Sequence, residues 1–206
     1  MKLYVTPRAP NPRRVTMFMA EKAITGIELV AVDINAHEHR SEAFRHLNPL
    51  TTVPTLVLDD GRALSESRAI CTWLEGQHPE PNLMGADADE LAFIEMADRR
   101  AEWYLMVPIG QVIRHTHPGL AALEQPQFAD YGQAQMAKVR DYASRFDQLL
   151  QTQPWMAGER FTIADITAFC ALEFARLMKF SPKAEGLDAL QAWRDRVAER
   201  PSAKAL

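Results

Sequence analysis

Thr6-Pro7-Arg8-Ala9-Pro10-Asn11-Pro12-Arg13-Arg14-Val15 joins a strand to a helix. The apolar run Leu3-Tyr4-Val5 before it predicts the strand, and its prolines predict a loop that opens directly into a helix over residues 12–22. Asn11 is a residue type that caps helices, and Pro12 suits a first helical position. A helix that begins beyond a strand end points free N–H groups above the sheet, which favours anionic or nucleophilic chemistry there. The segment itself offers no cysteine or serine as a nucleophile.

The composition of the 206 residues, 47% hydrophobic and 24% charged, is typical of a globular protein. A net charge of -4 argues against a nucleic-acid partner. No apolar run reaches the roughly 18 residues of a membrane span, and the chain enters its first strand without a signal-peptide pattern. Cys71 and Cys170 lie in apolar helical patterns, which predicts core thiols in a reducing compartment. We therefore expect a cytoplasmic protein without membrane or nucleic-acid partners.

The first part of the chain alternates between strand and helix. Residues 28–33 predict a second strand, which makes a strand–helix–strand unit with the segment described above. A polar connection over residues 35–45 follows. An Asp-Gly turn at residues 60–61 predicts a hairpin between a strand over 55–58 and one that ends near Leu64. Ser65-Glu66-Ser67 is expected to cap the next helix.

Every segment after Asp87 has helical periodicity. We expect helices over residues 91–107, 128–150, 166–178 and 187–199. Pro108 should kink or end the first of these, and a loop should occupy residues 115–126. Thr162 and Asp165 form a Thr-x-x-Asp pattern, which predicts a structural capping box rather than a catalytic acid.

Three motifs are spread along the chain: Asn48-Pro49 with Val53-Pro54-Thr55-Leu56, then Leu64-Ser65-Glu66-Ser67-Arg68-Ala69-Ile70, and the cap at Ala164-Asp165. In this order and spacing they resemble those of a cytosolic glutathione transferase. The resemblance implies an α/β thioredoxin-like N-terminal domain followed by an all-α helical-bundle C-terminal domain. The predicted divisions are a glutathione-binding domain over 1–78, a linker over 79–86 and a helical domain over 87–206.

The resemblance also implies a glutathione site at Val53, Pro54, Glu66 and Ser67. A cis Val53-Pro54 bond would turn the Val53 backbone toward the cysteinyl part of glutathione, whereas a trans proline at an edge strand is the structural alternative. Ser67 suits the γ-glutamyl carboxylate and Glu66 the ammonium group. The alternatives are a plain helix cap for Ser67 and a solvated charge for Glu66.

The resemblance places a basic side chain against the glycyl carboxylate of glutathione. His39 and Arg40 are the neighbouring candidates, His39 being favoured by its offset from Phe44 and Asn48. A solvated loop is the alternative for this stretch.

The family position of a catalytic cysteine or serine, five residues before Arg14, is Ala9 in this chain. Pro10-Asn11 resembles the bacterial nu class, in which an asparagine and a nearby threonine face the glutathione sulfur. Asn11 and Thr6 are therefore the candidates for stabilising the thiolate. A purely capping role for Asn11 is the alternative.

By resemblance, the second substrate would lie against Trp103, Tyr104, Met106 and Val107. The implied function is activation of the glutathione thiolate for conjugation to electrophiles, or for peroxide or disulfide reduction. A non-enzymatic binding or regulatory protein of the same fold is the alternative, kept open by Ala9. We expect a homodimer, with the first domain of one subunit against the helices of the other, and no metal site.

Overall fold

The computed structural model describes residues 1–205, which form two compact units. The first contains Met1–Asn82 together with the C-terminal residues from Pro201, and the second is Leu83–Arg200. The sequence analysis instead assigns residues 87–206 to the helical domain. The difference arises because the C-terminal segment is held on the first unit: Arg13 Nη2 donates to the Ala203 carbonyl at 2.8 Å, and Ser202 donates to Glu21.

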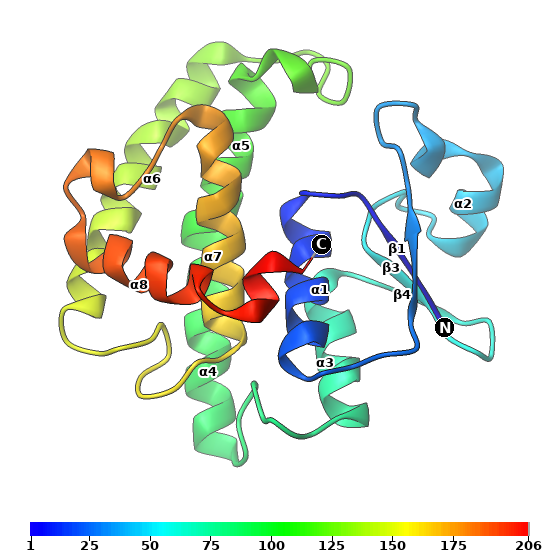
Figure 1. The fold of residues 1–206 in the computed structure, drawn as a ribbon. Coiled ribbons are helices and arrows are strands. Elements are labelled where there is room, and N and C mark those ends of the chain that lie inside the picture. Colours follow the sequence, from blue (N-terminus) through cyan, green and yellow to red (C-terminus); the bar gives the residue numbers. More distant parts are fainter. Residues whose placement is uncertain (206) are drawn as a thin grey trace. The chain divides into compact units, whose positions relative to one another are not determined.

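The first unit is built on a mixed sheet in the order β2-β1-β3-β4 (Figure 1). Strand β1 pairs parallel with β2 and antiparallel with β3, and β3 pairs antiparallel with β4. The elements of this unit are β1 Lys2–Val5, α1 Pro10–Glu21, β2 Glu28–Ala31, the 3-10 helix η1 Glu38–Arg40, α2 Glu42–Leu47, β3 Thr55–Val57, β4 Ala63–Ser65, α3 Ser67–Gln77 and the 3-10 helix η6 Pro201–Lys204.

Helices α1 and α3 lie on one face of the sheet and α2 lies on the other (Figure 1). Tyr4 of β1 contacts Phe44 of α2 edge-to-face, with ring centroids 5.8 Å apart. Since side chains alternate along a strand, the buried Leu3 and Val5 point to the face that α1 and α3 cover. The loop before β3 lies beside the starts of α1 and α3.

Two local predictions in this unit are wrong. Helix α1 begins at Pro10 with Ala9 as the flanking residue, so that Asn11 is the second helical residue and makes no cap, and Pro12 is the third. Pro10 satisfies the same preference for proline at a helix start that was assigned to Pro12. The connection over residues 35–45 contains η1 and the start of α2, which Ser41 caps by accepting from the Phe44 N–H at 3.3 Å. These helices are too short to show a helical period.

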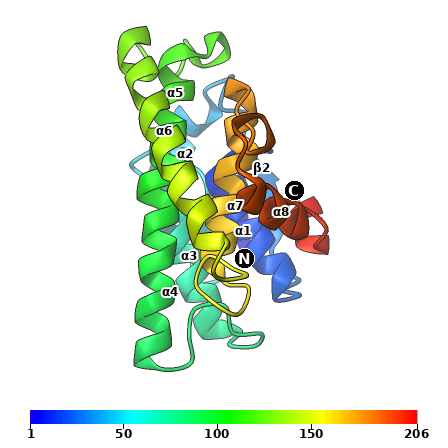
Figure 2. The same ribbon diagram turned by 90° about the vertical axis from the view of Figure 1, so that its left-hand side faces the viewer.

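The second unit is entirely helical. Its elements are α4 Ala88–Ala101, the π-helix η2 Glu102–Met106, α5 Val107–Thr116, the 3-10 helix η3 Pro118–Leu120, α6 Ala129–Leu150, α7 Ile163–Ala175, the 3-10 helices η4 Arg176–Met178 and η5 Lys183–Glu185, and α8 Asp188–Ala198. Figure 2 shows α6 running alongside α5.

The π-helix η2 joins α4 directly to α5. Pro108 is the second residue of α5, so it does not end the helix as predicted. Proline lacks an N–H, and its ring clashes with the carbonyl four residues earlier in a regular α-helix. A π-turn widens the helix at that place and leaves room for the ring. The predicted stop at Pro108 is therefore replaced by a π-turn over the preceding residues.

The predicted capping box is confirmed and starts α7 at Ile163, earlier than the expected residue 166. The Thr162 side chain accepts from the helix backbone, and the Asp165 carboxylate accepts from the Thr162 N–H at 2.9 Å. Helix α7 is buried along nearly its whole length. Cys71 and Cys170 are buried free thiols, as predicted.

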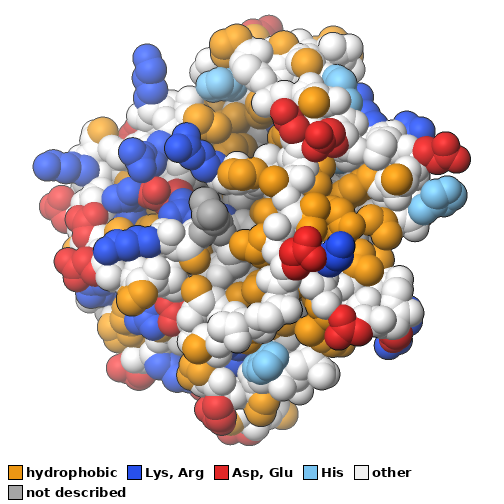
Figure 3. All heavy atoms as spheres, turned by 45° about the vertical axis from the view of Figure 1, so that its right-hand side comes forward, with side chains coloured by type: hydrophobic (Ala, Val, Ile, Leu, Met, Phe, Trp, Pro, Cys, Tyr) orange, Lys and Arg blue, Asp and Glu red, His pale blue; other side chains and the backbone are white. Residues whose placement is uncertain are grey.

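Charged side chains of both signs lie close together on the face drawn in Figure 3, with hydrophobic side chains exposed among them.

The exposed hydrophobic residues of α4 are Leu91, Phe93 and Met96. Among the helices of residues 1–205, none combines the length and apolarity needed to cross a membrane.

Candidate functional site

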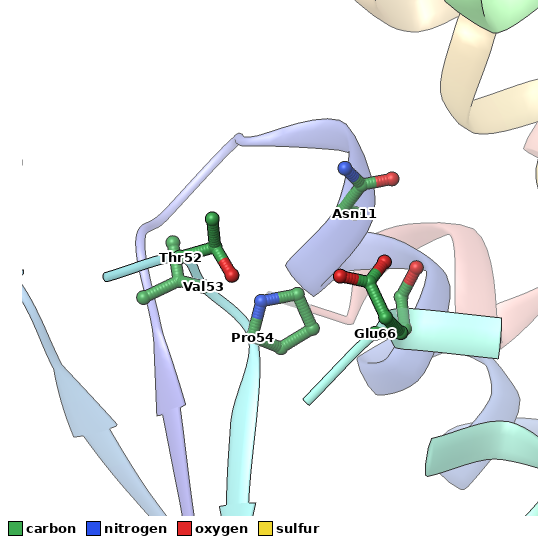
Figure 4. Close-up of a pocket in the computed structure, with 6 residues that line it drawn as sticks. Asn11, Thr52, Val53, Pro54 and Glu66 are labelled. Atoms are coloured by element: carbon green, nitrogen blue, oxygen red, sulfur yellow. The ribbon is translucent and has the colours of Figure 1, made fainter. Parts of the chain in front are cut away.

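A small cavity in the first unit brings together residues from distant parts of its sequence. Its volume is about 90 Å³, and its lining residues are Asn11, Thr52, Val53, Pro54, Glu66 and Ser67. They come from the start of α1, the loop before β3 and the start of α3 (Figure 4). This volume is below the roughly 300–1,000 Å³ of a pocket for a drug-sized ligand, so it suits one end of an extended molecule.

The first turn of α1 offers one free backbone donor to this cavity. Pro10 and Pro12 have no N–H, and the Arg13 N–H is donated to the Ala9 carbonyl at 3.1 Å. The Asn11 N–H therefore remains, together with the exposed side-chain amide of the same residue. The sequence analysis expected several free N–H groups at the start of this helix, but from Arg13 onward the N–H groups are used inside the helix.

The loop before β3 presents its backbone to the cavity. The Val53-Pro54 bond is cis. Within residues 1–205, neither the N–H nor the carbonyl of Val53 has a hydrogen-bond partner. A ligand lying along this loop in an extended conformation can pair with both groups, as a strand pairs with a sheet edge.

Buried Asn48 holds the loop in place. Its Nδ2 donates to the carbonyl and the hydroxyl of Thr52, both at 3.0 Å, and to the Thr55 hydroxyl at 3.1 Å. Its Oδ1 accepts from the Leu50 N–H at 3.1 Å. The amide thus fixes both ends of the segment that carries Val53.

Glu66 and Ser67 stand at the start of α3. Glu66 has φ 68° and ψ 112°, a backbone conformation that costs a non-glycine residue about 1–3 kcal/mol. Its carboxylate points into the space beside Pro54 and Asn11 (Figure 4). Ser67 is the first residue of the helix, and no side chain caps it, so the capping role considered for Ser67 is not the one observed.

Ser67 is 5% exposed, and its oxygen accepts a hydrogen bond from Arg14 Nη1 at 3.0 Å. The first N–H groups of a helix lack acceptors within that helix. The hydroxyl of Ser67 and the amino end of α3 therefore make one wall of the cavity suited to a carboxylate.

Three predicted site residues of the first unit do not line this cavity. Thr6 lies beside a separate cavity, and its hydroxyl donates to the Val32 carbonyl at 2.8 Å. His39 is buried in η1, where burial, and next the positive charges of Arg40 and His37, lower its pKa. Arg40 is exposed on the same short helix.

The residues predicted for the second substrate lie in the second unit. Trp103 and Tyr104 of η2 are 60% and 44% exposed. Met106 is buried and Val107 is half-buried. Residues 1–205 contain no cluster of three or more His, Cys, Asp or Glu side chains placed to hold a metal ion.

Three residues that line the cavity or hold its lining in place were not assigned to the site by the sequence analysis. Thr52 lines it directly, and its position next to Val53-Pro54 is the signal that would have identified it. Asn48 belongs to a quoted motif, but its positioning role depends on contacts that only the folded loop makes. Arg14 was used only as a reference point for Ala9.

Comparisons with known proteins match this architecture over the whole chain. The family model for the glutathione S-transferase N-terminal domain matches residues 9–77, and that for the C-terminal domain matches residues 106–201. The chain is 35% identical to glutathione S-transferase 2 of Saccharomyces cerevisiae, over 100% of this chain and 89% of that protein. It is 30% identical to glutathione S-transferase GstA of Escherichia coli O157:H7, over 98% of this chain and 94% of that protein.

A solved structure shows the same fold. The glutathione S-transferase domain-containing protein of Marinobacter aquaeolei VT8 superposes with a TM-score of 0.93 at 41% identity, covering 98% of this chain and 99% of that one. Together with the arrangement of the cavity, these matches show that the chain belongs to the glutathione S-transferase family of enzymes.

Proposed function

We propose that this chain binds glutathione at the cavity of the first unit and activates its thiol for transfer to an electrophile or for peroxide or disulfide reduction. The observation that carries the proposal is the convergence of three kinds of group on one cavity: the Asn11 donors, the unpaired Val53 backbone and the Glu66-Ser67 pair. Each matches a different part of a γ-glutamyl peptide. The membership of this chain in the glutathione S-transferase family supports a glutathione-dependent reaction in general.

Glutathione would bind with its γ-glutamyl end at the start of α3. The Ser67 hydroxyl donates to the α-carboxylate, and the Glu66 carboxylate accepts from the ammonium group. The cysteinyl part pairs with the N–H and carbonyl of Val53. His39 and Arg40 remain the candidates for the glycyl carboxylate; because the pKa of His39 is lowered, Arg40 supplies the positive charge of this pair near neutral pH.

The thiol would then lie near the start of α1, where Asn11 supplies the donors. A free thiol has a pKa of about 8.5, and lowering it by one unit needs about 1.4 kcal/mol of preferential stabilisation of the thiolate. A hydrogen bond to a charged group contributes about 1.5–3 kcal/mol. The amide and N–H of Asn11, at the positive end of a helix, are thus sufficient without a base.

The activated thiolate supports either reaction class. In conjugation it attacks an electrophilic carbon, a sulfur–carbon bond forms and the leaving group departs with its electron pair. In peroxide reduction it attacks one peroxide oxygen, so that a sulfur–oxygen bond forms, the O–O bond breaks and the departing alkoxide takes up a proton to leave as the alcohol. The thiol of a second glutathione then attacks the sulfur of the resulting sulfenic acid, which gives oxidised glutathione and releases the oxygen as water. The exposed Trp103 and Tyr104 remain candidates for contact with the second substrate.

A pH titration of bound glutathione tests the proposal. Thiolate absorbance is followed in the unaltered protein, in Asn11→Ala and in Asn35→Ala, the same substitution at an exposed loop residue outside the cavity. We expect a thiol pKa below the free value in the unaltered protein and in Asn35→Ala. In Asn11→Ala we expect a return toward the free value. Asn11 caps no helix, so its removal should leave the unfolding midpoint nearly unchanged.

A bound thiol that titrates as in free glutathione would contradict thiol activation and favour a binding protein that kept the fold. A lowered pKa that Asn11→Ala retains would remove the Asn11 side chain from the mechanism and leave the backbone N–H as the donor. Turnover with an aryl halide and with an organic hydroperoxide, measured on the same samples, separates conjugation from peroxide reduction.

A further inference from the structure

Arg14 is fully buried and contacts Ser67, which lines the cavity. It belongs to the second turn of α1 and reaches across to the first residue of α3, where Nη1 donates to the Ser67 hydroxyl oxygen at 3.0 Å. Arginine is rarely buried completely, because removing its charge from water costs several kcal/mol. Its contact with Ser67 places this charge next to a residue that lines the cavity.

The hydrogen bond has a fixed direction. A guanidinium group has donors and no acceptor, whereas a serine hydroxyl has one proton and two acceptor lone pairs. Ser67 must therefore accept from Arg14, and its own proton is directed elsewhere. Within residues 1–205, no protein group accepts that proton. Ser67 lines the cavity, so its hydroxyl proton is available to a ligand bound there.

We propose that Arg14 is a positioning residue for the substrate, orienting and polarising the Ser67 hydroxyl so that it donates to the α-carboxylate of the γ-glutamyl group. This inference rests on the proposed function. The resulting chain runs from guanidinium to hydroxyl to carboxylate, with a positive charge at one end and a negative charge at the other. Hydrogen bonds to charged groups are stronger than neutral ones, and bonds in such chains strengthen one another.

A purely structural role would instead have Arg14 join α1 to α3 without regard to the ligand. The two roles differ in one measurable respect. A positioning role weakens binding only of ligands that carry the α-carboxylate. A structural role weakens binding of every ligand that uses the cavity.

Calorimetric titration with two ligands separates the roles. The ligands are glutathione and its analogue in which 4-aminobutyrate replaces the γ-glutamyl residue, which lacks only the α-carboxylate. The proteins are the unaltered chain, Arg14→Met, Ser67→Ala and the control Arg45→Met. Arg45 is exposed on α2, so the control makes the same change in net charge away from the cavity.

We expect Arg14→Met and Ser67→Ala each to lose roughly tenfold or more in affinity for glutathione, as for a lost hydrogen bond to a charged group. For the analogue we expect changes of less than about twofold, because the interaction at issue is absent. Arg45→Met should bind both ligands as the unaltered protein does.

Arg14→Lys provides the second route if Arg14→Met does not fold. Lysine keeps the charge but lacks the planar geometry of the guanidinium. Its loss of affinity for glutathione should appear in the unaltered background and vanish when combined with Ser67→Ala. Persistence of that loss in the double variant would overturn the inference.

Equal losses for both ligands in Arg14→Met would overturn the inference and leave the proposed function intact. Failure of the unaltered protein to bind glutathione at all would overturn the proposed function, and this inference with it.

Discussion

Asp165 shows how burial and hydrogen bonding compete at a single residue. The carboxyl group is fully buried and accepts from the Met156 N–H at 2.9 Å, from Trp193 Nε1 at 2.8 Å and from Thr162. These donors favour the charged form, but the loss of hydration outweighs them. Burial raises the pKa of Asp165 to about 6.

The raised pKa predicts a dependence of stability on pH. The folded state holds the Asp165 proton more tightly than the unfolded state, whose pKa is the ordinary 3.8. This contribution is therefore complete below about pH 4 and is lost as the pH rises to about 6, by about 3 kcal/mol. Other carboxyl groups titrate in the same range, so the quantity to measure is a difference between variants.

Denaturant unfolding of the unaltered protein and of Asp165→Asn should show this difference. We expect the free energy of unfolding of the unaltered protein, relative to Asp165→Asn, to fall between pH 4 and pH 6.5. Asp188→Asn, at an exposed position in the first turn of α8, should show no such trend. A difference that is flat or rises over this range would mean that the donors outweigh burial.

At the scale of elements, Lys22 joins the end of α1 to the end of α3 and the segment after it. The side chain is completely buried, pairs with Glu75 at 2.7 Å and donates to the carbonyls of His78 and Pro81, both at 2.7 Å. All the directions in which an ammonium group can donate are thus used. Removing the ammonium group alone would leave these buried partners without their donor, which lowers the free energy of unfolding.

Lys22→Met should destabilise the fold by about 3–5 kcal/mol, because it removes the cation from a buried pair. Lys2→Met is the matched control. Lys2 pairs with Glu28 at 3.6 Å with both side chains more than half exposed, so its loss should cost about 0–1 kcal/mol. Equilibrium denaturation measures both. Equal effects for the two variants would show that the buried contacts of Lys22 add nothing.

At the scale of the whole molecule, α4 presents hydrophobic side chains to solvent. Leu91, Phe93 and Met96 are 53%, 63% and 39% exposed, and the last two are spaced to share one face of the helix. Exposed apolar side chains gathered on one surface are typical of protein–protein contacts. These side chains are therefore the candidate contact for the homodimer that the sequence analysis expects.

Light scattering after size-exclusion chromatography should give about twice the chain mass of 23.2 kDa. We expect Phe93→Lys combined with Met96→Lys to shift the protein toward monomer, since burying unpaired charges opposes association. Phe128→Lys makes a comparable change at a residue that is 58% exposed outside α4, and it should leave the mass unchanged. A monomeric unaltered protein would refute the homodimer.

The sequence by itself determined the features whose signals are local. The strand–helix–strand opening, the Asp-Gly hairpin and the Thr162-Asp165 capping box each depend on residues a few positions apart, and the structure contains all three. Boundaries were less exact: α1 begins at Pro10 rather than Pro12, because either proline satisfies the same local preference. The family resemblance also predicted that four residues share one site, and the structure places all four around one cavity: Val53, Pro54, Glu66 and Ser67.

Only the tertiary structure decided which groups are free to meet a ligand. Thr6 and Asn11 are equivalent candidates in the sequence, yet the Thr6 hydroxyl is donated to Val32, 26 residues away, while Asn11 faces the cavity. Arg14 donates to Ser67, which lies 53 residues further along the chain. Arg13 likewise holds the C-terminal segment on the first unit, although the residues that precede this segment belong to the second unit. Such pairings depend on how distant segments pack, and no local preference encodes which donor finds which acceptor.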